Sequence, residues 1–111
     1  MSDFCYNKDV PLKVLEENKN YRKVLAHSDN VMIAEVYFEN GAEGAAHTHV
    51  HEQISYCLEG KFEYTIEGVS KILEKGDSVY VASNLVHSCK VLSEKGVLLD
   101  VFTPQREDFL N

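Results

Sequence analysis

Short apolar runs, bounded by turn-forming residues, divide most of this chain. Between positions 61 and 67, Phe62, Tyr64 and Ile66 alternate with charged or polar residues, which gives an extended segment one dry and one wet face. The other runs are rich in β-branched or aromatic residues and end at glycine, asparagine or aspartate. The pattern predicts eight strands, over residues 21–26, 31–38, 54–58, 61–66, 69–73, 78–81, 88–91 and 97–102.

Strands at spacings of about 8 to 12 residues, with almost no helix between them, are typical of an antiparallel sandwich or barrel. The dry face of residues 61–67 favours a barrel with a lined interior. Ahead of the strands, residues 9–18 carry several apolar side chains with Pro11 near their start, which indicates a short helical or extended segment. We expect one all-β domain over residues 1–111, with its barrel core over about 21–104.

Composition narrows the possible partners. The 111 residues are 44% hydrophobic, enough for a single core, and their net charge of -7 comes from interspersed acids and bases. No basic stripe is present to neutralise a phosphate backbone, so we expect no nucleic acid partner. The apolar runs are shorter than the roughly 20 residues that cross a bilayer, so we expect no membrane partner. An acidic ligand would need a local cation or a metal to hold it.

Three cysteines stand far apart in the chain, at Cys5, Cys57 and Cys89. Their odd number and the lack of a charged-then-apolar leader favour a reducing cytoplasm. We expect Cys57 and Cys89 to be small core residues rather than metal ligands.

Histidines concentrate in the stretch AHTHVHEQ at positions 46–53. In an extended chain, residues at spacing two point the same way with Cβ atoms about 7 Å apart, so His47 and His49 can converge on one metal ion. Exposed loop histidines are the alternative. Two strand ligands rarely complete a coordination shell, and His87 is the distant residue that a chain returning across the barrel could present. We expect His27, beside a turn, at the surface.

The spacing around these histidines resembles the two cupin motifs. Gly41, His47-Thr48-His49, Gln53 and Gly60 match the first motif, and Gly76 and His87 match the second, where Ala82 and Asn84 replace a customary proline and glycine. The resemblance implies a jelly-roll barrel with a metal held by His47, His49, Gln53 and His87.

Gln53 stands where most cupins carry glutamate, and the change removes one negative charge from the ion. This favours a Lewis-acid role over oxygen activation, although it decides neither. Glu52 is the rival ligand, but on a strand that begins at Gln53 it would face away from His49. His51 could lie at the pocket rim or behind the ligands.

Asp100 interrupts the apolar strand at 97–102 and shares a face with Phe102. If this face is the barrel interior, burial raises the pKa of the carboxyl and suits it to proton transfer. An edge-strand aspartate in water, or one paired with Arg106, is the alternative.

Arg106 follows Pro104, which ends the last strand and turns the chain. Its guanidinium could return over the barrel mouth and hold a carboxylate through two hydrogen bonds. A surface ion pair with Glu107 or Asp108 is the alternative.

These positions together are similar to those of one cupin family, the KdgF type of pectin degradation, which acts on unsaturated uronates. The residues that carry the likeness are His47, His49, Gln53, His87, Asp100, Phe102 and Arg106. The resemblance implies conversion of 4,5-unsaturated monouronates to linear keto-uronates, and a homodimer. In this interpretation Asp100 moves a proton, Arg106 grips the carboxylate and Phe102 forms an apolar wall.

The donor set suits one divalent transition metal, and Ni, Zn, Fe, Co and Mn all stay open. Two other functions stay open as well. One is an iron-dependent cupin dioxygenase that uses the same ligands. The other is a non-catalytic sugar-binding or sensor cupin.

Overall fold

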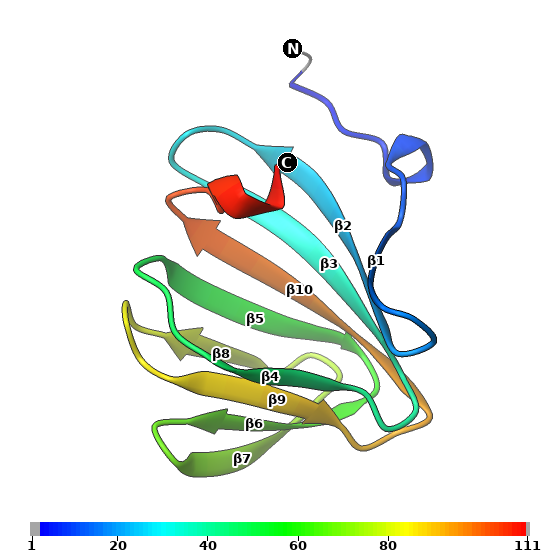
Figure 1. Ribbon diagram of the computed structural model, residues 1–111, viewed down its shortest axis with the longest axis vertical. Helices are drawn as coiled ribbons and strands as arrows, with labels where there is room; N and C mark the ends of the chain where they lie inside the picture. Colours follow the sequence, from blue (N-terminus) through cyan, green and yellow to red (C-terminus); the bar gives the residue numbers. More distant parts are fainter. Residues whose placement is uncertain (1–2, 111) are drawn as a thin grey trace.

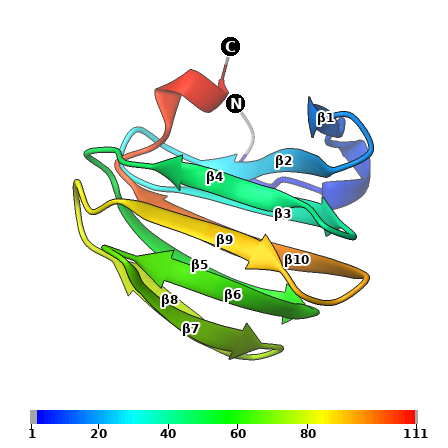
Figure 2. The same ribbon diagram turned by 60° about the horizontal axis from the view of Figure 1, so that its bottom comes forward.

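The computed structural model describes residues 3–110, most of which belong to two antiparallel sheets. The larger sheet has the order β1-β2-β3-β10-β5-β8 and the smaller one the order β4-β9-β6-β7. The two sheets face each other and enclose the interior (Figures 1 and 2). The elements are η1 (Asn7–Asp9), β1 (Lys13–Glu16), β2 (Asn20–His27), β3 (Met32–Glu39), β4 (Glu43–His47), β5 (Glu52–Glu59), β6 (Lys61–Ile66), β7 (Val69–Glu74), β8 (Ser78–Val81), β9 (His87–Val91), β10 (Lys95–Thr103) and η2 (Glu107–Phe109).

The predicted all-β jelly roll is confirmed, and each of the eight predicted strands is present with shifts of at most a few residues at its ends. Two further strands, β1 and β4, were not predicted. The sequence of β4, with Gly44, Ala45 and Ala46, has a low intrinsic strand propensity, and the strand forms through its pairing with β9. Of the two forms predicted for residues 9–18, the extended one is present as β1, whereas the short 3-10 helix η1 ends at Asp9, the first residue of this segment.

Alternation along β6 places its large side chains in the core. Phe62 and Tyr64 are buried, whereas Lys61 and Glu63 are exposed. The ring of Phe62 packs edge-on against Phe38 with 5.0 Å between centroids. A β-carbon at Gly96 would lie only 2.6 Å from the Phe62 ring, so glycine is required where β10 passes this side chain. This packing holds the two sheets together behind the polar end of the interior.

Strand register brings distant parts of the chain together at one end of the molecule. β4 ends and β9 begins with His47 opposite His87, while Gln53 near the start of β5 lies opposite Phe102 near the end of β10. The chain crosses between the sheets at this end, on the left in Figure 1, and η2 lies over the end of β10 there. Residues from four strands can therefore line one site.

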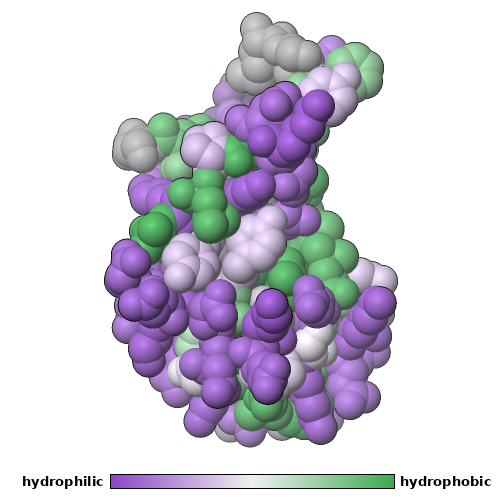
Figure 3. Space-filling view, turned by 90° about the vertical axis from the view of Figure 1, so that its right-hand side faces the viewer, coloured by the Kyte–Doolittle hydropathy of each residue, from purple (hydrophilic) through white to green (hydrophobic). Residues whose placement is uncertain are grey.

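The face seen in Figure 3 is mostly hydrophilic, with several hydrophobic patches between the charged side chains. Across residues 3–110, none of the helices has the length and apolar character needed to span a membrane. The single domain, the homodimer and the cytoplasmic location stay predictions.

Replacement of Phe62 by alanine should destabilise the fold strongly, because this fully buried ring contacts both sheets. We expect the free energy of unfolding to fall by about 3–5 kcal/mol, measured by chemical denaturation. Val69→Ala on β7, where the side chain is exposed, is the control and should change it by less than about 0.5 kcal/mol. Equal effects of the two substitutions would contradict this description of the core.

Candidate metal centre

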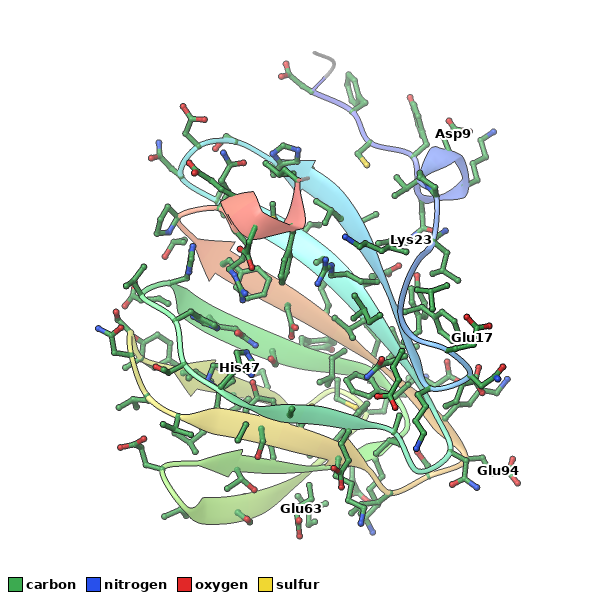
Figure 4. The ribbon with its side chains drawn as sticks, viewed as in Figure 1. Asp9, Glu17, Lys23, His47, Glu63 and Glu94 are labelled. Atoms are coloured by element: carbon green, nitrogen blue, oxygen red, sulfur yellow. The ribbon has the colours of Figure 1, made fainter. Side chains whose placement is uncertain are left out.

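Three histidines from separate segments meet at the open end of the interior. His47 is the last residue of β4 (Figure 4), His49 lies in the following loop and His87 begins β9. Their potential ligand nitrogens all lie within 4.8 Å of one another. The ring centroids of His47 and His87 are 4.3 Å apart, and those of His49 and His87 are 4.9 Å apart. The cluster could bind one metal ion.

A single unbroken strand through the histidine stretch does not form. β4 ends at His47 and β5 begins at Glu52, because the chain leaves the smaller sheet and joins the larger one here. The connecting loop is anchored by the backbone NH of Asn84, which donates to the His49 carbonyl at 2.8 Å. His49 therefore reaches the cluster from a fixed loop.

Each of the three imidazoles is oriented by a backbone carbonyl near it in sequence. The Nδ1 atoms lie at hydrogen-bond distance from these oxygens: His47 from Ala45 (2.8 Å), His49 from His51 (3.0 Å) and His87 from Leu85 (3.0 Å). A carbonyl oxygen only accepts, so each Nδ1 carries the proton and each neutral ring keeps a lone pair on Nε2.

The Nε2 atoms are therefore available as ligands. Nε2 of His87 is buried and has no hydrogen-bond partner among the described residues. Burial lowers the pKa of His49 and of His87, which favours the neutral form that binds metal. A second hydrogen bond that fixes ring orientation is typical of metal-ligating histidines, so these residues fit a metal centre.

Gln53 faces the same point from β5. Its side chain is buried, and its Nε2 donates to Ser55 Oγ at 3.0 Å and to Tyr64 OH at 3.2 Å. The amide oxygen then lies 3.0 Å from Nε2 of His49. With the His49 proton on Nδ1, two lone pairs face each other, an arrangement that a cation between them would stabilise. Glu52, the rival ligand, is exposed and accepts a hydrogen bond from Tyr80.

A buried hydrogen-bond network connects Gln53 to Asp100. Ser55 donates to Asp100 Oδ1 at 2.6 Å, and Tyr64 OH lies 3.0 Å from Ser55 Oγ. An ionised carboxylate only accepts, so Ser55 must donate to it, and Tyr64 must donate to Ser55. Every proton in the network is thereby directed toward Asp100, and the amide oxygen of Gln53 is left for the imidazoles.

Asp100 faces the interior and is only 9% exposed. Burial raises the pKa of its carboxyl to about 6, against the opposing effects of the Ser55 hydrogen bond and the Arg106 charge. This carboxyl can therefore exchange a proton near neutral pH.

Sequence reasoning did not identify Ser55 or Tyr64. The sequence does indicate that both point into the interior. Ser55 lies two residues after Gln53 and so on the same face of β5, and Tyr64 places a hydroxyl on the apolar face of β6. Parity alone does not show which polar atoms touch, so the network itself required the structure.

A cavity of about 340 Å³ is lined by the polar groups of the site other than His49: His47, Gln53, Ser55, Tyr64, His87 and Asp100. Its wall includes Phe102, which is buried and packs edge-on against Phe109 with 5.5 Å between centroids. His47 also lines the cavity and is exposed to solvent. A small molecule in this cavity could therefore contact His47, His87 and Asp100.

Arg106 shows both arrangements that the sequence left as alternatives, a guanidinium at the cavity and an ion pair with Asp108. Its guanidinium lines the cavity and lies over Phe109 and Phe102, with 4.2 and 5.3 Å from Cζ to the ring centroids. It also donates to Asp108, from Nε to Oδ1 at 3.1 Å and from Nη2 to Oδ2 at 2.9 Å. The ion pair thus fixes Arg106 over the cavity and at the same time occupies one edge of its guanidinium.

The remaining histidines and cysteines lie outside the three-histidine cluster. The His51 ring packs against His49 with 5.4 Å between centroids, and His27 is partly buried with Nδ1 2.9 Å from Gln105 Oε1. Cys57 belongs to the core. Cys89 lines the cavity, but burial raises the pKa of its thiol to about 12, which disfavours the thiolate needed for metal binding.

Comparisons with known proteins agree with this geometry. The family model described as Cupin domain matches residues 34–102. The pectin degradation protein KdgF of Dickeya dadantii (strain 3937) is 43% identical over 90 residues, which cover 80% of this chain and 82% of that protein.

Two solved structures are similar over nearly their whole length. The structure of KdgF from Halomonas sp. has a TM-score of 0.91 at 31% identity and covers 98% of this chain and 99% of its own. An RmlC-like cupin from Shewanella frigidimarina NCIMB 400 has a TM-score of 0.92 at 33% identity and covers 98% of this chain and 96% of its own. The chain therefore belongs to the cupin family and, within it, to the KdgF type.

Proposed function

We propose that this protein is a metal-dependent enzyme that opens the ring of 4,5-unsaturated monouronates and converts them to linear keto-uronates. The observation that carries the proposal is the shared cavity, which places two members of the histidine cluster, His47 and His87, around one space with the buried carboxyl of Asp100 and the guanidinium of Arg106. The names of the Dickeya and Halomonas relatives support an acidic sugar as the substrate class.

The reaction is an isomerisation that needs no oxidant. A base removes the proton of the anomeric hydroxyl, and the bond between C1 and the ring oxygen breaks to leave an aldehyde. The ring oxygen takes the electron pair as an enolate across C4 and C5, and a proton added at C4 completes the ketone. The site must therefore move one proton and stabilise one oxyanion.

His47, His49, His87 and the amide oxygen of Gln53 would hold one divalent transition metal, which suits Ni, Zn, Fe, Co or Mn. When bound, the metal supplies positive charge for the oxygen that becomes negative. Asp100 takes up the hydroxyl proton and returns it to C4, since its raised pKa lets it both accept and donate near neutral pH.

Arg106 and Phe102 position the sugar in this mechanism. The free nitrogen protons of Arg106 attract the uronate carboxylate, which the negative charge of the protein would otherwise repel. Phe102 forms an apolar wall beside His49, with 6.0 Å between ring centroids, and excludes water from the reacting atoms.

The proposed reaction is tested by incubation of the metal-loaded protein, without oxygen, with unsaturated monouronates released by a polysaccharide lyase. We expect the ultraviolet absorbance of the conjugated enol ether to disappear, because the product lacks the double bond. A chelator should stop the loss, and Asp100→Asn should abolish turnover while sparing ligand binding. Oxygen-dependent loss would instead indicate a dioxygenase, and binding without turnover a sensor.

Replacement of His87 by asparagine should remove one ligand and weaken metal binding at least a hundredfold, since even the groups that orient metal ligands contribute roughly 10- to 100-fold. The measurement is metal content after equilibrium dialysis, with titration of Ni or Zn. His27→Asn is the matched control, because His27 bonds to Gln105 away from the cluster, and it should bind metal like the unaltered protein. Unchanged binding in His87→Asn would exclude this metal site.

The pH profile should report the ionisation of Asp100. Because the proposed base must be ionised, we expect kcat/KM to fall about tenfold per pH unit below pH 6. Ser55→Ala removes a hydrogen bond that lowers this pKa, so the acid limb should move to higher pH. Ser70→Ala, which alters a hydroxyl on the exposed side of β7, is the control. An acid limb that stays in place in Ser55→Ala would remove Asp100 from the mechanism.

A further inference from the structure

Arg22 is a second cationic residue whose side chain faces the cavity. It lies on β2 between Asn20 and Val24, two residues whose side chains point into the interior, and it pairs with Val36 on β3. Arg22 and Val36 both line the cavity that His47 and His87 also line. A cation on the inward parity of a strand is unusual, because burial disfavours charge.

The guanidinium of Arg22 has no acceptor among the described residues. Its Nε is buried without a hydrogen-bond partner, and none of the ion pairs within residues 3–110 includes it. Its Cζ lies 3.5 Å from the centroid of the Phe109 ring, which covers one face and leaves the nitrogen protons unused. A partly buried cation without an acceptor is costly unless a ligand supplies one.

Arg106, unlike Arg22, already has an acceptor for its guanidinium. Its Nε and Nη2 already donate to the two oxygens of Asp108, the paired geometry that a guanidinium offers a carboxylate. Both arginines stack on the ring of Phe109 and both line the cavity, so an anion in the cavity at the edge of this ring could contact both. Burial lowers the pKa of Arg22, and the charge of Arg106 lowers it further, against the opposing effect of Asp108; a bound anion would offset both the burial and the repulsion.

We infer that Arg22 is the primary anchor for the carboxylate of the substrate, with Arg106 beside it as the second contact. The inference rests on the proposed function, because it takes the ligand to be a uronate. Arg22 has no acceptor for its guanidinium among the described residues, whereas Asp108 already accepts from Nε and Nη2 of Arg106. The specificity for an acidic rather than a neutral sugar then resides on β2, far in sequence from the histidine motif.

The test compares Arg22→Met, Arg22→Lys and Lys23→Met. Lys23→Met is the matched control, because it removes the same charge from the next residue of β2, where Lys23 points toward η1 (Figure 4) and donates to Asn7. Turnover of lyase-generated unsaturated monouronate gives KM and kcat. Titration of each protein, made in the Asp100→Asn background, with galacturonate and with its neutral methyl ester gives the charge-dependent part of binding.

Arg22→Met should raise KM and weaken galacturonate binding by about 10- to 100-fold, the usual effect of losing hydrogen bonds to a charged group. It should leave kcat and methyl ester binding nearly unchanged, because the lost contact does not involve the reacting atoms. Arg22→Lys should give an intermediate loss, since lysine keeps the charge without the two-pronged geometry. Thermal unfolding should show no loss of stability in Arg22→Met, whereas a merely structural role would lower Tm.

Several results would overturn the inference, and they are distinguishable from failure of the reaction. Normal turnover with a KM in Arg22→Met equal to that of Lys23→Met would exclude Arg22 as the anchor and leave the proposed function standing. Galacturonate binding that depends on Arg22, without turnover by the unaltered protein, would support the anchor and contradict ring opening. Absence of both binding and turnover in the unaltered protein would contradict both proposals.

Discussion

Hydrogen bonds from three imidazole Nδ1 atoms to backbone carbonyls are the constraint on which the site depends. Each bond fixes a ring and a tautomer through a carbonyl only two residues away, so the backbone path determines where the Nε2 lone pairs point. The β4–β9 pairing and the anchored loop after β4 then bring the three lone pairs together. With the opposite tautomer, the same rings would present protons to one another and repel a cation.

The interior of the barrel holds both a set of potential metal ligands and a carboxyl that can exchange a proton. Burial lowers the pKa of His49 and of His87, which favours the neutral form that binds metal, while burial raises the pKa of Asp100 to about 6. Ser55 and Tyr64 connect the two parts, because an ionised Asp100 directs their protons and thereby turns the amide oxygen of Gln53 toward His49. Arginines at the cavity supply the positive charge that the protein as a whole lacks.

Much of this arrangement is readable in the sequence. Period-two alternation identifies β6 and the dry face of the interior, and the parity of Gln53 against Glu52 predicts which of them is buried. Strand β4 is not predictable from propensity, since its pairing with β9 overrides the glycine and alanines. Contacts between neighbouring strands, such as Ser55 of β5 with Asp100 of β10, depend on strand register, which no local pattern encodes.

X-ray absorption of the Zn-loaded protein tests the central claim most directly, because it reports the atoms that bind the metal. The account predicts only nitrogen and oxygen neighbours, at about 2.0–2.1 Å, with the outer-shell scattering of three imidazoles. A sulfur neighbour at about 2.3 Å, or a shell with fewer than two imidazoles, would show that the three histidines do not share the ion and would contradict the account.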